Sequence, residues 1–176
     1  NVFYHPGLGF RFPIPRGFKA VNQPSQVVMV EGQNRAVLGF TGTAESSAEA
    51  VAAKLLSQRG LRVVERGSTR INGFPAVGVL AEAQTQNGQI VTLTTYFIEY
   101  RGKVYQFIGY VPQQLFGSFQ SAFLQTIRGF AEIQDSRILA RQPVRLTLLR
   151  VSRSAPFREL IPRALPAPFT AAEIAI

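Results

Sequence analysis

The middle of the chain alternates between strand-like runs and short glycine-containing pairs. The pairs are Asn72-Gly73, Asn87-Gly88 and Arg101-Gly102. Asn-Gly between alternating runs predicts a hairpin because both residues of such a tight turn take positive φ, and Arg-Gly is a weaker signal of the same kind. The runs, rich in Val, Ile, Thr, Tyr and Phe, cover residues 62–71, 76–86, 89–100 and 103–111. They predict a four-stranded antiparallel meander with one face on a core and the other toward solvent.

Two segments with apolar residues at helical spacing flank the meander. Before it, Ser46, Ser47 and Glu49 provide the start of a helix, and Gly60 is expected to end it. The apolar stripe of this helix consists of Val51, Ala52, Leu55 and Leu56. After the meander, a helix is expected over residues 114–128, ending at Gly129. Its stripe consists of Phe116, Phe119, Phe123, Leu124 and Ile127, which is typical of a helix packed on a core.

Three shorter strands are expected ahead of the first helix, over residues 8–14, 25–30 and 36–42. Pro13 and Pro15 favour an edge strand that ends in a turn for the first of them. The order β-β-β-α-β-β-β-β-α predicts an α+β fold in which helices pack on an antiparallel sheet.

The composition changes near residue 134. Residues 134–176 contain seven Arg and three acidic residues, and their pattern predicts a strand at 144–151 and short helices at 157–165 and 170–176. We therefore predict a main domain over residues 1–133 and a small β-α-α appendage over residues 134–176. Because the chain begins with Asn1 and ends abruptly at Ile176, it is expected to be an excised or processed piece of a longer protein.

The net charge of +9 comes mostly from arginine, which supplies 16 of the 19 cationic side chains. Two interpretations stay open: a solvated basic surface, or an anionic partner such as a phospholipid, a glycan polymer or an acidic protein. Nucleic acid is disfavoured because the charges are scattered and no recognition motif is present. The apolar runs are too short for a transmembrane segment.

Few side chains could carry chemistry. The chain has one His, no Cys and one Asp. The absence of Cys excludes disulfides, thiolate metal sites and a Cys nucleophile, and a lone His5 excludes the paired histidines of a zinc peptidase helix. His5 is expected to stabilise a local turn or to pack. Glu82 and Glu99 are expected to be cross-strand neighbours that pair with Arg. We predict no catalytic, cofactor-binding or metal-binding residue in this fragment.

The opening Tyr4-His5-Pro6-Gly7-Leu8-Gly9-Phe10-Arg11-Phe12-Pro13-Ile14-Pro15-Arg16-Gly17-Phe18 carries a family resemblance. PsbP/Mog1-like domains often begin with an aromatic residue, a short turn, G-F-x-F and then P-x-G-W/F. Their helix–meander–helix order also matches the order predicted above. The resemblance covers about residues 1–133 and implies a domain with a non-catalytic binding role.

The same opening is similar to the region that follows the catalytic domain in exported bacterial Ste-like zinc metallopeptidases, whose catalytic helix carries HExxH. The residues from Arg145 to Val151 and from Pro156 to Ile161 resemble a degenerate LysM-like module, in which Arg153-Ser154-Ala155-Pro156 replaces the usual G-D-T-L turn. This resemblance implies a zinc metallopeptidase parent, with zinc in an upstream catalytic domain. It also implies export to the periplasm or outer envelope, with the upstream peptidase domain, a protein partner, or peptidoglycan or another anionic envelope component as partner.

Two functions are therefore carried forward. The first is a non-catalytic accessory domain of an exported cell-envelope zinc metallopeptidase, which serves substrate binding, partner binding or envelope attachment. The alternative is a free-standing exported PsbP/Mog1-like lipoprotein or scaffold that binds a protein partner. Since Tyr and Arg are enriched at binding hot spots, the candidate surface lies on the meander. It consists of Tyr96, Tyr100, Arg101, Tyr105 and Tyr110. Packing of these tyrosines beneath the helices stays open as the other interpretation.

Overall fold

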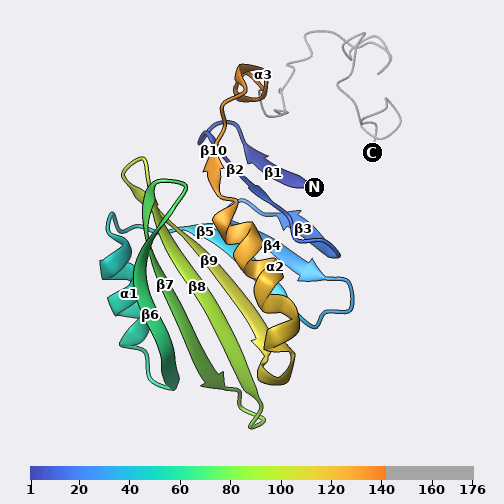
Figure 1. Cartoon of the computed structure of the whole chain (residues 1–176), viewed down its shortest axis with the longest axis vertical. Helices are drawn as coiled ribbons and strands as arrows, with labels where there is room; N and C mark the ends of the chain where they lie inside the picture. The colour runs from blue at the N-terminus through green and yellow to red at the C-terminus, as the bar shows by residue number, and fades with distance from the viewer. Residues whose placement is uncertain (142–176) are drawn as a thin grey trace, which may run out of the picture. The chain divides into compact units, whose positions relative to one another are not determined.

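The computed structural model describes residues 1–141, and its compact unit spans Asn1–Ala140 (Figure 1). The elements in chain order are β1 (Val2–His5), β2 (Phe10–Pro13), β3 (Phe18–Asn22), β4 (Gln26–Glu31), β5 (Val37–Gly42), α1 (Ala48–Leu56), β6 (Leu61–Ile71), β7 (Phe74–Gln84), β8 (Ile90–Tyr100), β9 (Lys103–Pro112), the 3-10 turn η1 (Gln113–Leu115), α2 (Phe116–Arg128), β10 (Ala131–Glu132) and α3 (Ser136–Leu139). The predicted α+β class is confirmed. The LysM-like module predicted for the appendage lies outside the described residues.

The meander forms one half of a seven-stranded antiparallel sheet with the order β3-β4-β5-β9-β8-β7-β6. The predicted β6–β7 and β8–β9 hairpins are confirmed, because both residues of Asn72-Gly73 and of Arg101-Gly102 have positive φ. At Asn87-Gly88 only Gly88 has positive φ. The loop there is longer, and Thr85 N–H donates to Gln89 O at 2.8 Å.

Both predicted helices are present, with shifted ends. The side chain of Ser47 caps α1 by accepting from Ala50 N–H, and Glu99 Oε1 accepts from Ala48 N–H at 2.8 Å. Glu99 was predicted to neighbour Glu82, but it pairs with Val104 in the sheet, and Glu82 pairs with Thr92. That prediction was wrong because register, fixed by the hairpin turns, separates the two carboxylates. Glu82 does pair with an arginine, Arg62.

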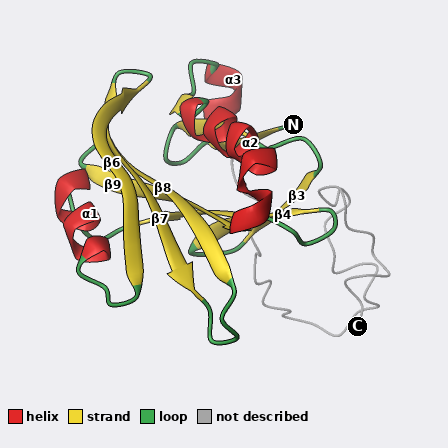
Figure 2. Ribbon diagram, turned by 60° about the horizontal axis from the view of Figure 1, so that its bottom comes forward, coloured by secondary structure: helices red, strands yellow, loops and turns green. Residues whose placement is uncertain are grey.

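The main sheet is covered on both faces (Figures 1 and 2). On one face α1 packs on β7 and β8, with Ala48, Ala52, Val77 and Phe97 among the buried residues. On the other face α2 and a small sheet, ordered β1-β2-β10, close over a core rich in phenylalanine. Side chains alternate between faces along a strand, so Phe97 belongs to the first core and its neighbour Ile98 to the second.

The N-terminal strands differ from the prediction. The strands β1, β3 and β10, of four, five and two residues, were not predicted. β2 is the central strand of the small sheet, so the prediction of an edge strand was wrong. Pro13 is tolerated because β10 pairs only with Phe10 and Arg11, so no third strand meets the end of β2. His5 Nδ1 accepts from Leu8 N–H at 3.2 Å, which confirms its predicted role in a turn.

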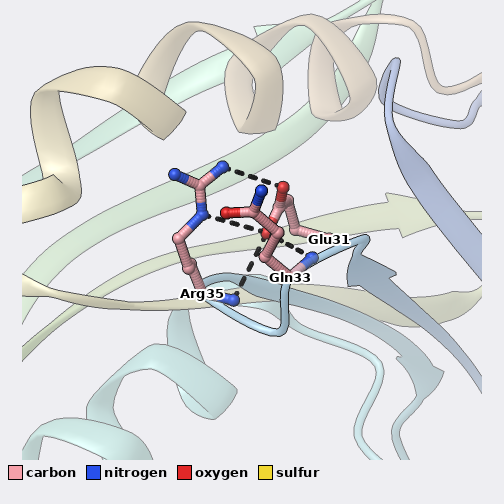
Figure 3. Close-up of polar contacts among 3 residues, drawn as sticks. All are labelled: Glu31, Gln33 and Arg35. Carbon is pink, nitrogen blue, oxygen red and sulfur yellow. Dashed lines mark hydrogen bonds and ion pairs between the residues drawn. The ribbon is translucent and has the colours of Figure 1, made fainter.

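A hydrogen-bonded loop joins β4 to β5 beside α2 (Figure 3). The carboxylate of Glu31 accepts from Gln33 N–H at 2.9 Å and from the Arg35 guanidinium at 3.0 and 3.2 Å. These bonds, from Arg35 above all, lower the pKa of Glu31 to about 2. The Arg35 guanidinium also lies 5.5 Å from the centre of the Phe119 ring on α2. The loop is thereby tied to the helix.

Candidate functional site

The five residues predicted to form a binding surface lie at different depths. Tyr100 and Tyr105 are buried, at 3% and 5% exposure, Tyr96 is half-buried, and Tyr110 is 42% exposed. Tyr96 pairs with Phe107, and Tyr110 lies three residues farther along β9, so these two side chains point to opposite faces. The residues therefore do not form one continuous surface, because strand alternation and burial separate them. Partner contact by any of them stays a prediction.

Tyr100 and Arg101 connect the β8–β9 hairpin to the small sheet. The Tyr100 hydroxyl donates to Gly9 O at 3.0 Å, and its burial raises the pKa of the phenol. The Arg101 guanidinium pairs with Glu132 and lies 5.2 Å from the centre of the Tyr100 ring. A side chain at Gly9 would begin 2.7 Å from Arg101 Nη1, so the contact is close. These two residues hold the fold together, and changing both to Ala is expected to destabilise the domain.

A groove of about 630 Å³ lies on the α2 side of the main sheet, a volume within the range of ordinary ligand sites. Its lining comes from β6, β7, β8 and one side of α2. The lining residues are Glu65, Gly67, Ser68, Thr69, Arg70, Ile71, Asn72, Gly78, Val79, Leu80, Thr94, Tyr96, Phe116, Gln120, Leu124 and Arg128. We refer to it as the β6–α2 groove.

Two glycines without side chains form part of the floor of the β6–α2 groove. Gly67 on β6 pairs with Gly78 on β7, and Gly78 pairs with Tyr96 on β8. A Cβ at Gly78 would lie 2.9 Å from the Tyr96 ring, whereas a Cβ at Gly67 would meet nothing within 4 Å. The Tyr96 ring therefore lies against the Gly78 backbone, and the space above Gly67 is open.

The backbone of β6 lines one side of the groove. Six consecutive residues, 67–72, contribute to the lining. Because side chains of a strand alternate between faces, consecutive residues can line one groove only if the strand's backbone does so as well. β6 is also an edge strand, paired on one side with β7, so its other side has unpaired backbone groups.

The opposite wall is one face of α2. Phe116, Gln120, Leu124 and Arg128 follow one another at four-residue intervals, which places them along one side of a helix. Leu124 was predicted to be part of the helix's core stripe, but it lines the groove. Phe119, Phe123 and Ile127 are buried as predicted.

The floor also contains a buried hydroxyl without a partner. Thr94 is 5% exposed, and its Oγ1 makes no hydrogen bond within the described part of the chain. A buried polar group of this kind costs about 1–3 kcal/mol relative to a bonded one. The Thr95 hydroxyl, which does not line the groove, is buried without a partner in the same part of the chain, so this feature alone does not mark a ligand site.

The two ends of the groove carry opposite charge. Glu65 lies at one end of the lining part of β6, and Arg128 lies at the other, where Asn72 Nδ2 donates to Arg128 O at 2.8 Å. Within residues 1–141 neither Glu65 nor the Arg128 guanidinium has an ion pair. Arg70 donates to Gly73 O instead. An elongated ligand with an anionic group near Arg128 would complement this charge distribution.

The sequence interpretation missed the groove apart from Tyr96. A signal was present, since Gly67 and Gly78 are equidistant from the Asn72-Gly73 turn and must pair once that hairpin is predicted. Two paired glycines without side chains leave a gap on a sheet. What the sequence could not supply was the position of α2 across that gap.

A second open surface lies on the α1 side of the sheet. The row Val21, Val28, Gly39 and Ile108 crosses β3, β4, β5 and β9, and α1 packs on β7 and β8. Val21 is 52% exposed and Tyr110 in the adjoining row is 42% exposed. This apolar surface is thus only partly covered by the described residues.

Residues 1–141 contain no group of three or more His, Asp or Glu side chains placed to hold a metal ion. None of the helices in this part of the chain is long and apolar enough to cross a membrane. The prediction that this fragment binds neither zinc nor another cofactor stays a prediction.

Comparison with known proteins shows the fold. No family model matches the chain, and no curated protein matches it. Among solved structures, the cyanobacterial PsbP (CyanoP) of Synechocystis sp. PCC 6803 superposes with a TM-score of 0.60 at 13% identity, over 75% of this chain and 91% of CyanoP. The chain therefore has a PsbP-like fold, as predicted.

Two further structures have similar folds. LpqN, described as involved in cell envelope biogenesis of Mycobacterium tuberculosis, superposes with a TM-score of 0.50 at 14% identity, over 69% of this chain and 81% of LpqN. A Bacteroides thetaiotaomicron protein superposes with a TM-score of 0.55 at 13% identity, over 77% of this chain and 49% of that one. At these identities the likeness concerns the fold alone.

Proposed function

We propose that this chain is a non-catalytic accessory domain that binds a protein partner in the β6–α2 groove. The observation that carries the proposal is the groove itself, with an unpaired strand edge along its side. Open hydrogen-bonding groups around a preformed groove are a binding feature. The residues lining the groove include no histidine and one carboxylate, Glu65, which suits recognition better than acid–base chemistry.

The parent protein in this proposal is an exported cell-envelope zinc metallopeptidase, and the domain presents substrate or a partner to it or attaches it to the envelope. The support is the resemblance of residues 4–18 to the region after Ste-like catalytic domains. LpqN, which shares the fold, is described as an envelope-biogenesis protein. Zinc would be held by the upstream domain. An anionic envelope component such as peptidoglycan is a further partner compatible with the net charge of +9.

The alternative is a free-standing exported lipoprotein or scaffold of the same fold. The observation in its favour is that CyanoP is matched over 91% of its chain, so one such domain forms nearly all of another protein. The apolar row from Val21 to Ile108 would give a scaffold a second contact surface. A catalytic HExxH domain directly upstream in the same reading frame supports the first function and excludes the alternative.

The partner proposal is tested by photocrosslinking in the source cells with the full-length protein. A photoreactive amino acid replaces Gln120 in the groove, and Lys54, whose side chain is 74% exposed on α1, serves as the control position. The expected result is a discrete adduct with an envelope protein, or with the upstream peptidase domain, from position 120 and not from position 54. Identical adduct patterns from both positions, or none from position 120, would contradict partner binding in the groove.

A further inference from the structure

The free edge of β6 is unusually accessible for a strand of eleven residues. Natural sheets protect long edges with bulges, charged side chains or covering elements. Here the only bulge lies between Val63 and Glu65, and the ladder is regular from Glu65 to Ile71. Residues 62–70 are all exposed. The second half of β6 therefore has a straight, uncovered edge.

Several polar side chains of β6 are held by neighbouring elements. Arg66 and Ser68 both bind Glu49 of α1, so they extend over the α1 face of the sheet. Arg62 binds Glu82 on the neighbouring strand. Between them, Gly67 has no side chain. An approaching chain would meet the β6 backbone directly.

From this arrangement we infer that the β6–α2 groove binds an extended acidic peptide segment, which adds to the main sheet as a strand next to β6. Strand addition supplies main-chain hydrogen bonds for affinity, and a groove beside the edge accepts alternate side chains for selectivity. The inference rests on the proposed function and specifies the class of partner. Residues on both faces of the strand, 67–72, line the groove, so the backbone of β6 is available beside it.

Strand direction and charge together specify the segment. Every pairing in the main sheet is antiparallel, so an added strand is expected to be antiparallel to β6. Its N-terminal end would then lie near Ile71 and Arg128, and its C-terminal end near Glu65. An Asp or Glu near the N-terminal end would pair with the Arg128 guanidinium.

The first test selects ligands from a displayed library of random ten-residue peptides against the full chain. Enriched peptides are expected to alternate β-branched residues and to carry an acidic residue in the first half. One such peptide and its Asp→Asn counterpart are then labelled with fluorescein and titrated by anisotropy. We expect the Asn peptide to bind about tenfold more weakly, since the charge-assisted hydrogen bond to Arg128 becomes a weaker neutral one. Enrichment of basic or helical peptides, or of none, would overturn the inference.

Variants then locate the site. Gly67→Phe places a ring in the open groove, where a Cβ meets nothing within 4 Å, and it should abolish peptide binding while the protein stays folded. Gly117→Phe is the matched control, because Gly117 also has open space around its Cβ and does not line the groove. Arg128→Ala should remove the difference between the Asp and Asn peptides. Undiminished binding to Gly67→Phe would overturn the inference.

Failure of this inference and failure of the proposed function are distinguishable. If position 120 crosslinks to a partner but the selected peptides do not compete with that adduct, the groove binds a partner by another mode, and strand addition is excluded. If position 120 yields no adduct, the proposed function itself fails. Circular dichroism of each variant confirms that loss of binding does not come from unfolding.

Discussion

The two halves of the main sheet differ on the face toward α2. One cross-strand row runs Val27, Phe40, Phe107, Tyr96, Gly78 and Gly67, from β4 to β6. At β5 and β9 the row is filled with aromatic rings, and Phe12 of the small sheet lies 4.7 Å from Phe40 and 5.1 Å from Phe107, centre to centre. At β6 and β7 the same row consists of two glycines, Gly67 and Gly78, which have no side chains. The same strand geometry thus gives a closed core in one half and a groove in the other, and side-chain volume makes the difference.

The largest expected effect comes from opening the closed half. Phe107→Ala removes a fully buried ring that contacts Phe12, Phe40 and Phe130. The free energy of unfolding should fall by about 3–5 kcal/mol, the usual cost of such a truncation. Urea denaturation followed by circular dichroism measures this change. A loss below 1 kcal/mol would mean that this half is not the stabilising core.

A methyl group added to a glycine should have opposite effects in the two halves. At Gly109 on β9 a Cβ would lie 2.7 Å from the Phe123 ring, so Gly109→Ala should destabilise by about 1–3 kcal/mol. At Gly67 the same change meets no neighbour, and the gain in strand propensity should stabilise by about 0.5–1 kcal/mol. Denaturation midpoints of the two variants give the comparison directly. Equal destabilisation at both positions would contradict an open groove.

Removing the Thr94 hydroxyl should change the stability of the groove floor without changing peptide binding. Thr94→Val keeps the shape but deletes a buried oxygen that has no partner within residues 1–141. The free energy of unfolding should therefore rise by about 1 kcal/mol, while the affinity for a selected acidic peptide should stay the same because the oxygen is buried. Thermal denaturation and anisotropy measure the two quantities. A loss of stability would show that the hydroxyl already contributes to the fold.

The smallest effect concerns the loop beside α2 in the closed half. Because the folded pKa of Glu31 lies near 2, below its ordinary value of 4.5, the pairing with Arg35 stabilises the protein above pH 4.5. This stabilisation is lost as the pH falls through 2. In Glu31→Gln the stability should change less between pH 5 and pH 2 than in the unaltered protein, and salt should reduce the difference. Denaturation midpoints across that range test it, and parallel pH profiles would contradict it.

The sequence predicted the meander, both main helices and the α+β class because each has a local signal. Each signal spans only a few residues, as in the turn pair Asn72-Gly73 and the helical spacing of Phe119, Phe123 and Ile127. The strand β10 depends on pairing with β2 across more than a hundred residues of chain, which no local pattern encodes. The Glu99 cap on α1 bridges 51 residues and was missed for the same reason.

The candidate site was less predictable than the fold. Tyr and Arg were chosen for their chemistry, but Tyr100 and Tyr105 are held in the aromatic core, and Arg101 pairs with Glu132. The groove depends on what is missing at Gly67 and Gly78 and on the position of α2. Composition does not show that two glycines lie side by side on a sheet. The register of the β6–β7 hairpin does, because it pairs Gly67 with Gly78.

The two edges of the main sheet allow the most direct test of the account. Backbone amide hydrogen exchange is measured for β6 and for the opposite edge strand, β3, with and without a selected acidic peptide. We predict that the peptide slows exchange at alternate residues between Glu65 and Ile71 and leaves β3 unchanged, because β6 is the one of these two edge strands that adjoins the groove. Unchanged exchange along β6, or equal slowing along β3, would contradict the central claim that a partner segment adds to β6 as a strand beside the groove.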